Sequence, residues 1–487
     1  MVLVIGIDGA SPGMVERLTS TGRMPTLRAL MRHGVYGHLE SSANCSPASA
    51  WSSVLTGVTP ARHGVWDLQN LAPGSYEWQP AHARLLRAPT LPQLLTDRGL
   101  EVGTVLVPMT FPAREAEWTT VAGWLAPSVD AEGFAHPRRV ASMAARRLQD
   151  VPLRPRMGSF ARSGQYEGGI ESALKALHAK AGLARELLAD RRWDMLIVNF
   201  TELDPIQRWC WHLTDRRHPE YREELMTRHG ELIADAYAQA DALVAELIDA
   251  LRPSDHLLII APYGATLSSR APACVPDLMS HLELLATRSS AGGAWRRLTR
   301  TIADASDSAL NALHGVLPGA LADLLPERLG GDEVGHRGDG DPWIDYGRSW
   351  VLPTPGGHLF LNTEAEFPLG IVPGGVLDSL EMNIISKLQT GIDPATGRRP
   401  LEWAQRRQEL FSGPYLSRIP HIVTRWQDRD VVTGLTVTGR DGRVEVARPS
   451  GISMPSGAPG PEGVLILAGA GVRRGVRVEG ARVEDVA

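Results

Sequence analysis

The chain opens with Met1-Val-Leu-Val-Ile-Gly-Ile-Asp8-Gly9, and this stretch decides the fold. A short, almost continuous apolar run is typical of a strand that is buried on both faces, as in a parallel sheet. The carboxylate and glycine that follow indicate a tight turn at the carboxyl end of that strand, where open α/β sheets bind their ligands. We therefore predict a strand over Val2–Ile7, with Asp8 at the edge of a site.

The same pattern recurs along the chain and alternates with helical patterns. Further strands are predicted over Val102–Val107, Met195–Phe200 and His256–Ala261, and helices over Met14–His33, Ala173–Leu188 and Glu223–Leu251, with another helix opening at Trp51–Leu55. This alternation predicts an α/β fold, a three-layer α/β/α sandwich whose central sheet is mainly parallel.

The alternation stops after residue 267. We expect a core over 1–267 that includes cap elements at about 70–165, a helical insertion with a Gly-rich loop over 268–342, a small α/β insertion over 343–440 and a return to the core over 441–487. A strand at His358–Asn362 and a helix at Gly375–Leu388 mark the small insertion, and a strand at Val464–Ala468 marks the return.

Composition excludes several classes of protein. The 487 residues are 43% hydrophobic and 22% charged with a net charge of −5, which fits a globular chain and gives no basic surplus for nucleic acid. No apolar run is long enough to span a membrane, and the first residues lack the basic region of a signal peptide, so we expect a cytoplasmic protein. Three isolated cysteines exclude a disulfide framework and a Cys-rich zinc module. The oligomeric state is not readable.

Six short motifs occur in order along the chain. They are Gly6-Ile-Asp8-Gly9, Ala50-Trp51-Ser-Ser-Val-Leu-Thr56-Gly57, Pro60-x-x-His63-Gly64, Phe200-Thr-Glu-x-Asp204, Phe411-Ser-Gly413-Pro and Pro461-Glu462-Gly463. Together they resemble the type I phosphodiesterase/nucleotide pyrophosphatase branch of the alkaline phosphatase superfamily. The resemblance implies that superfamily's sandwich with a cap and a small insertion. It also implies a further C-terminal helix beyond Ala487, so we expect the last part of the core to be truncated.

The resemblance implies two metal ions, usually zinc, held by six side chains. Two of these ligands are kept as Asp8 and Asp204, whereas the other four positions hold Arg208, Pro262, Tyr263 and Pro459. Proline has no side-chain donor, and the fixed cation of arginine does not coordinate metals. Two separate carboxylates make a poor zinc site, so we expect no metal and no cofactor.

The resemblance places the family's Thr or Ser nucleophile on Pro47. Ser46 precedes this position and Ser49 follows it, at the start of a predicted helix whose N–H groups can receive an anion. Ser46 is therefore either a nucleophile or an ordinary N-cap. Our candidate catalytic residues are Asp8, Ser46, Asp204 and His212, and our candidate substrate-binding residues are Asn44, Ser49, Arg208, Tyr263 and His358.

Two interpretations stay open for Arg208, Tyr263 and His212. Arg208 can bind a phosphate with two donors, or it can pair with Asp204 or Asp8 as a salt bridge. Tyr263 can donate to an anion or merely fill the vacated space. His212 lies one helical turn from Arg208 and can act as acid or base, or can be a helix-face histidine. The segment of His358 faces the substrate in the family that the chain resembles.

Three functions remain. The first is an altered enzyme that binds a phosphorylated or nucleotide-like small molecule and performs metal-independent group transfer or elimination, for example in specialised metabolism. The second is a catalytically inactive binding or scaffold protein, and the third is a conventional metal-dependent phosphodiesterase. A closed pocket, bridged by Arg208 and filled by Tyr263, favours the second. An open one, with Asp8, Arg208 and His212 pointing inward, favours the first.

Overall fold

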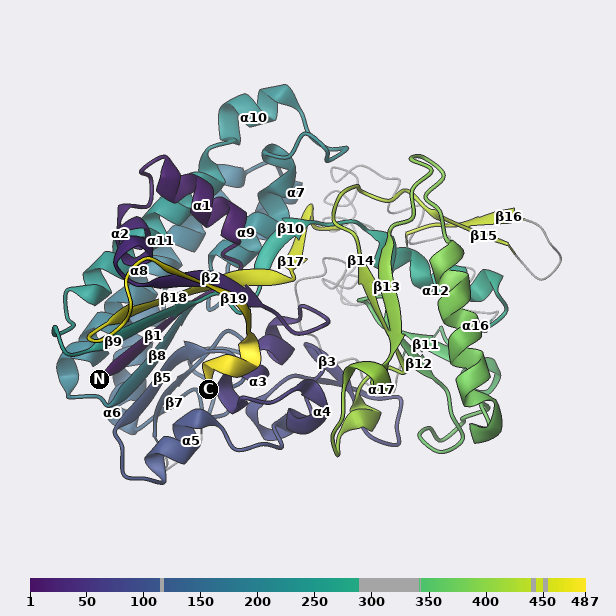
Figure 1. Cartoon of the computed structure of the whole chain (residues 1–487), viewed down its shortest axis with the longest axis horizontal. Helices are drawn as coiled ribbons and strands as arrows, with labels where there is room; N and C mark the ends of the chain where they lie inside the picture. The colour runs from purple at the N-terminus through teal and green to yellow at the C-terminus, as the bar shows by residue number, and fades with distance from the viewer. Residues whose placement is uncertain (114–117, 289–340, 342, 439–443, 450–453) are drawn as a thin grey trace, which may run out of the picture.

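A nine-stranded sheet forms the centre of the computed structural model, which describes residues 1–113, 118–288, 341, 343–438, 444–449 and 454–487 (Figure 1). Its strands, in spatial order, are β19 (Val476–Arg482), β2 (Val35–Glu40), β18 (Glu462–Gly469), β9 (His256–Ile260), β1 (Val2–Ile7), β8 (Met195–Phe200), β5 (Val102–Val107), β6 (Thr119–Ala122) and β7 (Ala135–His136). β1, β5, β6, β8 and β9 are parallel, whereas β18 and β7 run against their neighbours. The predicted, mainly parallel α/β sheet is confirmed.

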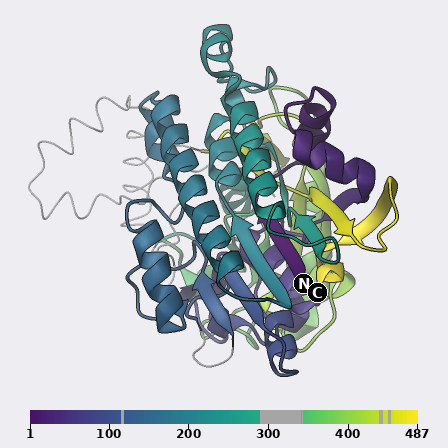
Figure 2. The same ribbon diagram turned by 90° about the vertical axis from the view of Figure 1, so that its left-hand side faces the viewer.

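Helices cover both faces of this sheet, as the buried strands require. In β1, Leu3 and Ile5 pack in one apolar cluster with α8 (Tyr166–Asp190) and α11 (Leu232–Ile248). Val4, which points to the opposite face, packs in a second cluster with α3 (Pro47–Thr56). Figure 2 shows the long helices lying across the first of these faces. Successive side chains of a strand point to opposite faces of the sheet, and each face is covered by its own helices. This alternation therefore produces the three layers.

The helix predicted over Met14–His33 is wrong, because the structure has two. α1 covers Pro12–Ser20 and α2 covers Pro25–His33. Gly22 between them has a φ of +80°, a left-handed conformation that a helix interior does not allow. Pro25 lacks the N–H that a continuous helix would need and instead opens α2.

The helix predicted over Glu223–Leu251 is also two helices, α10 (Glu223–His229) and α11, separated at Gly230. The strands predicted over Val2–Ile7, Val102–Val107 and Met195–Phe200 have these bounds in the structure, and the other predicted elements are present with shifted ends. The other α-helices among the described residues are α4 (Pro60–His63), α5 (Leu91–Thr96), α6 (Arg138–Leu148), α7 (Met157–Arg162), α9 (Leu203–Cys210), α12 (Val275–His281), α16 (Leu377–Thr390) and α17 (Arg407–Leu410). No helix within the described ranges has the length and apolar character needed to cross a membrane.

A second, four-stranded antiparallel sheet lies beside the first in Figure 1, with α16 packed against it. Its order is β11 (Val351–Pro353), β12 (Leu359–Leu361), β14 (Ile422–Trp426) and β13 (Leu401–Arg406). Three two-stranded ribbons complete the strands: β3 (Gln69–Leu71) with β4 (Trp78–Pro80), β10 (Gly264–Leu267) with β17 (Gly457–Gly460), and β15 (Leu435–Thr438) with β16 (Val444–Ala447). Most of the expected helical insertion and Gly-rich loop, residues 289–340, lies outside the described residues. The domain boundaries stay a prediction.

Candidate functional site

The carboxyl ends of β1, β8 and β9 meet at one edge of the central sheet. Ile7 is aligned with Phe200 of β8, and Gly6 with Ile260 of β9, so the residues after all three strands come together. Gly9 has a φ of +80°, and a Cβ there would lie 2.9 Å from the Cα of Asp204. The glycine therefore lets the turn after β1 lie directly against α9.

Asp8 is fully buried beneath this edge. Its Oδ1 accepts a hydrogen bond from Trp51 Nε1 at 2.8 Å, and its Oδ2 accepts one from Asn199 Nδ2 at 3.1 Å. Burial raises the pKa of Asp8 to about 6, with a smaller rise from the charge of Asp204, while the donors on Trp51, Asn199 and Thr201 lower it. Asp8 is therefore a carboxyl group that titrates close to neutral pH.

Two guanidinium groups meet at Asp204 from different elements. Arg154 Nη2, from the loop before α7, donates to Oδ2 at 3.1 Å, and Arg208 Nε, one turn along α9, donates to Oδ1 at 3.2 Å. The Asp204 side chain is 2% exposed, whereas the side chains of Arg154 and Arg208 are 12% and 15% exposed. Arg208 and Asp204 thus form a salt bridge in the structure, and binding of a phosphate by Arg208 stays a prediction. Arg154 was not predicted, because its loop carries no motif.

Tyr263, three residues after β9, is fully buried and lies near enough to these groups to feel their charges. Its hydroxyl has no hydrogen-bond partner among the described residues. Burial raises the pKa of Tyr263 well above its usual value, and the charges of Asp204 and Asp8 act in the same direction, whereas those of Arg154 and Arg208 lower it. The phenol therefore remains a protonated hydrogen-bond donor.

The hydroxyl of Ser46 does not cap α3, although Ser46 stands at the N-cap position. It is buried without a partner of ordinary hydrogen-bond geometry among the described residues, and it lies beside the carboxyl of Asp67. Burial raises the pKa of Asp67, while the Ser46 hydroxyl, the Leu68 N–H and the charge of Arg208 lower it. Ser46, Asp67 and Arg208 therefore form one group, in which Asp67 was not predicted.

The two other predicted residues of this segment have structural surroundings. Asn44 Oδ1 accepts hydrogen bonds from the Ser46 N–H at 3.3 Å and from Ser42 Oγ at 3.0 Å, so Asn44 shapes the turn before α3. Ser49 is fully buried in the first turn of α3, and its hydroxyl has no partner within the described part of the chain.

The rings of His212 and His358 face other groups. His212 bonds Tyr166 Oη through Nε2 and Ser456 Oγ through Nδ1, both at 3.1 Å, and burial lowers its pKa. His358 Nδ1 accepts the Thr424 N–H at 3.1 Å, and its ring packs edge-on against Trp66. The contacts of both rings thus hold the structure together. Within the described part of the chain, neither ring forms a hydrogen bond or ion pair with Asp8 or Asp204.

The residues present do not fit the metal pair that the family implies. Both oxygens of Asp8 and both oxygens of Asp204 accept hydrogen bonds from the protein, and two of those donors are fixed cations. Across the described ranges, no three His, Cys, Asp or Glu side chains gather in a way that could hold a metal ion. A divalent cation beside Asp204 would face the positive charges of Arg154 and Arg208.

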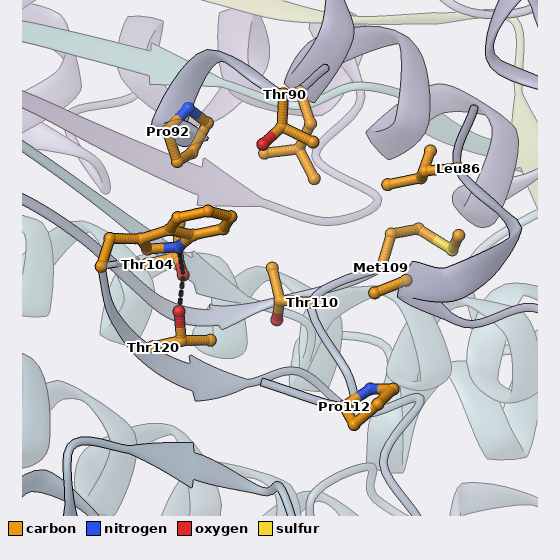
Figure 3. Close-up of a pocket in the computed structure, with 11 residues that line it drawn as sticks. Leu86, Thr90, Pro92, Thr104, Met109, Thr110, Pro112 and Thr120 are labelled. Carbon is orange, nitrogen blue, oxygen red and sulfur yellow. Dashed lines mark hydrogen bonds between the residues drawn. The ribbon is translucent and has the colours of Figure 1, made fainter. Parts of the chain in front are cut away.

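A separate small cavity lies at the other end of α3. Figure 3 shows it between β5, β6 and α5, with Thr104 in the middle of a hydrogen-bonded group that includes Trp118 and Thr120. Its volume of about 20 Å³ holds roughly one water molecule. None of the predicted site residues lines it, so it is not part of the candidate site.

Comparison with known proteins gives the same family as the motifs. Residues 2–289 match the profile of type I phosphodiesterase/nucleotide pyrophosphatase. Phosphonoacetate hydrolase from Sinorhizobium meliloti 1021, solved with phosphonoformate, superposes with a TM-score of 0.53 at 15% identity, over 99% of this chain and 93% of the hydrolase. Human ectonucleotide pyrophosphatase/phosphodiesterase 5 gives 0.50 at 11% identity, over 100% and 92%. No curated protein sequence matches. At these identities the superpositions show the fold alone.

Proposed function

Because the chain belongs to the type I phosphodiesterase/nucleotide pyrophosphatase family, we propose that its site binds a phosphorylated or nucleotide-like small molecule with arginine in place of metal. One observation carries this proposal: Arg154 and Arg208 converge on Asp204 at the edge of the sheet where a ligand would approach, and both side chains are partly exposed. A guanidinium matches two phosphate oxygens with parallel N–H donors.

The charges of the site favour an anion because arginine offsets the carboxylates. Asp8 and Asp204 alone would repel a phosphate. Two permanent cations offset them, and a phosphate dianion can share the guanidinium groups with Asp204. The Tyr263 hydroxyl supplies a protonated donor next to these groups.

The closed arrangement favours binding without turnover. Arg208 bridges to Asp204, Tyr263 is fully buried, and His212 is bonded elsewhere, which is the pattern expected of a catalytically inactive member. We also propose a reducing, cytoplasmic setting, which three free cysteines support.

Metal-independent group transfer is the second candidate, and the position of Ser46 beside Asp67 favours it. A bond would form between Ser46 Oγ and phosphorus while the bond from phosphorus to the leaving oxygen breaks, and the leaving group would depart as its anion with the electron pair of that bond. The Ser46 proton would pass to Asp67. A hydroxyl needs such a neighbouring base to act as a nucleophile.

Calorimetric titration of the full chain with inorganic phosphate and with adenosine monophosphate, with and without a chelator, tests both proposals. We expect saturable binding that the chelator leaves unchanged, and hydrolysis of bis(4-nitrophenyl) phosphate at background. Single-turnover release of 4-nitrophenol would favour group transfer by Ser46. Zinc-stimulated hydrolysis, together with two bound metals in elemental analysis, would overturn the metal-free site.

A further inference from the structure

A buried ion pair contacts the loop before α7 that carries Arg154. Lys180 of α8 and Glu202, in the turn between β8 and α9, are 2% and 0% exposed and pair through Nζ and Oε1. Lys180 Nζ also donates to the carbonyl oxygen of Leu153 at 2.6 Å. Leu153 is the residue before Arg154, so the pair ties the backbone of this loop to the turn just before α9, the helix that carries Asp204.

A second contact holds the side chain of Arg154. Its guanidinium lies over the ring of Trp124, 4.5 Å from the ring centre, and from there reaches Asp204. A flat aromatic face restricts the guanidinium to one plane. The backbone and the side chain of Arg154 are therefore fixed by separate groups.

A gain in stability alone does not explain why this ion pair is buried. Taking both charges out of water offsets most of their attraction, and well-packed apolar residues can often replace such a pair without loss of stability. The bond from Lys180 to the Leu153 carbonyl is what an apolar replacement could not provide. Its effect falls on the loop of Arg154.

The geometry points to Arg154 as a second phosphoryl-binding residue, with Lys180 and Glu202 as positioning residues that hold it at the site. This inference rests on the proposed phosphate binding and names the residues that would provide it besides Arg208. The expected ligand group is a phosphate dianion, since two guanidinium groups converge where its oxygens would lie.

Calorimetric titration with inorganic phosphate tests this on the full chain. Arg154→Ala should weaken binding roughly tenfold to a hundredfold, as expected for loss of a hydrogen bond to a charged group. Arg156→Ala is the matched control, because Arg156 is an exposed arginine of the same loop. Among the described residues it forms no hydrogen bond or ion pair with Asp8, Asp204 or Arg208. It should bind phosphate like the wild type.

The positioning role is tested by replacing the buried pair with Lys180→Met and Glu202→Leu together. This change should weaken phosphate binding in the wild-type background but not further in the Arg154→Ala background, because the pair acts through Arg154. A merely structural role would weaken both backgrounds alike. Should the double replacement not fold, Trp124→Leu against Trp124→Phe tests whether Arg154 must be held in place, and Trp124→Leu should bind phosphate more weakly than Trp124→Phe, which keeps a flat ring.

The outcomes separate the two proposals. Wild type that does not bind phosphate overturns both. Wild type that binds and is weakened by Arg208→Ala, but not by Arg154→Ala, overturns the role of Arg154 and leaves the proposed function standing. Equal losses from the pair replacement in both backgrounds overturn the positioning role alone.

Discussion

Arg208 carries a permanent charge at a position where the family resemblance implies a metal ligand, and its two possible roles can be separated by mutation. Its Nε bonds one oxygen of Asp204, while Arg154 bonds the other. Because Arg154 would still pair with Asp204, removal of Arg208 does not leave an isolated buried charge. The effect should therefore fall on ligand binding more than on the fold.

We predict that Arg208→Ala weakens phosphate binding by about 2–5 kcal/mol, as for loss of one partner in a desolvated charge pair. The melting temperature should fall only slightly. Arg208→Lys should recover little affinity, because an ammonium cannot reproduce the two-donor fork. Calorimetry and thermal unfolding on the same samples decide this. A large fall in stability with unchanged affinity would assign Arg208 to the salt bridge alone.

Ser46 offers a second test at the level of one side chain. A working N-cap contributes about 0.5–2 kcal/mol, but the Ser46 hydroxyl makes no capping bond. We predict that Ser46→Ala lowers the free energy of unfolding by less than this range, measured by urea denaturation. A loss at the upper end would show that the hydroxyl does cap α3 in solution. If group transfer occurs, Ser46→Ala and Asp67→Asn should each abolish it.

Among the elements, the turn from β1 to α1 is held closest to the site. Gly9 has a left-handed φ and leaves no room for a Cβ beside Asp204. We predict that Gly9→Ala destabilises the fold by about 1–3 kcal/mol through backbone strain and also weakens phosphate binding. Gly13→Ala is the matched control, since Gly13 lies in α1 with open space around it. This substitution should stabilise the fold by up to about 1 kcal/mol. Equal effects of the two changes in denaturant unfolding would contradict the strain argument.

The elements that sequence reasoning located well are those with a strong local signal. The strands ending before Asp8 and Asp204 are continuous apolar runs, and their parallel pairing brings both carboxylates to one edge. Helix breaks were missed because apolar periodicity continues across Gly22. Arg154 and Asp67 were missed for a different reason. Both lie in irregular segments, and only tertiary contacts bring them to the site.

The charge state of buried histidines contributes to how the stability of the whole molecule depends on pH. Burial lowers the pKa of His63 and of His358 to about 3. In the unfolded chain each ring binds a proton below about pH 6.5, so unfolding takes up protons between these values. Stability contributed by the neutral rings is therefore complete above about pH 6.5 and lost as the pH falls towards 3. Asp8 has the opposite effect on stability. Because its pKa is raised in the folded protein, the folded state binds a proton first as the pH falls below about 6, and this favours folding.

We predict that His63→Gln makes the fall in stability between pH 7 and pH 5 less steep, by up to about 1.4 kcal/mol per pH unit. The variant should be less stable at neutral pH, because His63 bonds Ser53 Oγ and the Val65 N–H, both at 3.2 Å. Urea denaturation at several pH values measures the slopes. Identical slopes for the variant and the wild type would mean that His63 is protonated in the folded protein.

The pairing around Asp204 also limits what a single substitution at this edge can change. Arg208→His would place one imidazole at the sheet edge, but Arg154 would still bond Asp204 and keep positive charge there. Tyr263 and Pro459 would have to be replaced by ligating residues as well before zinc had enough ligands. Several simultaneous replacements, and not one, would therefore be needed to build a metal centre here.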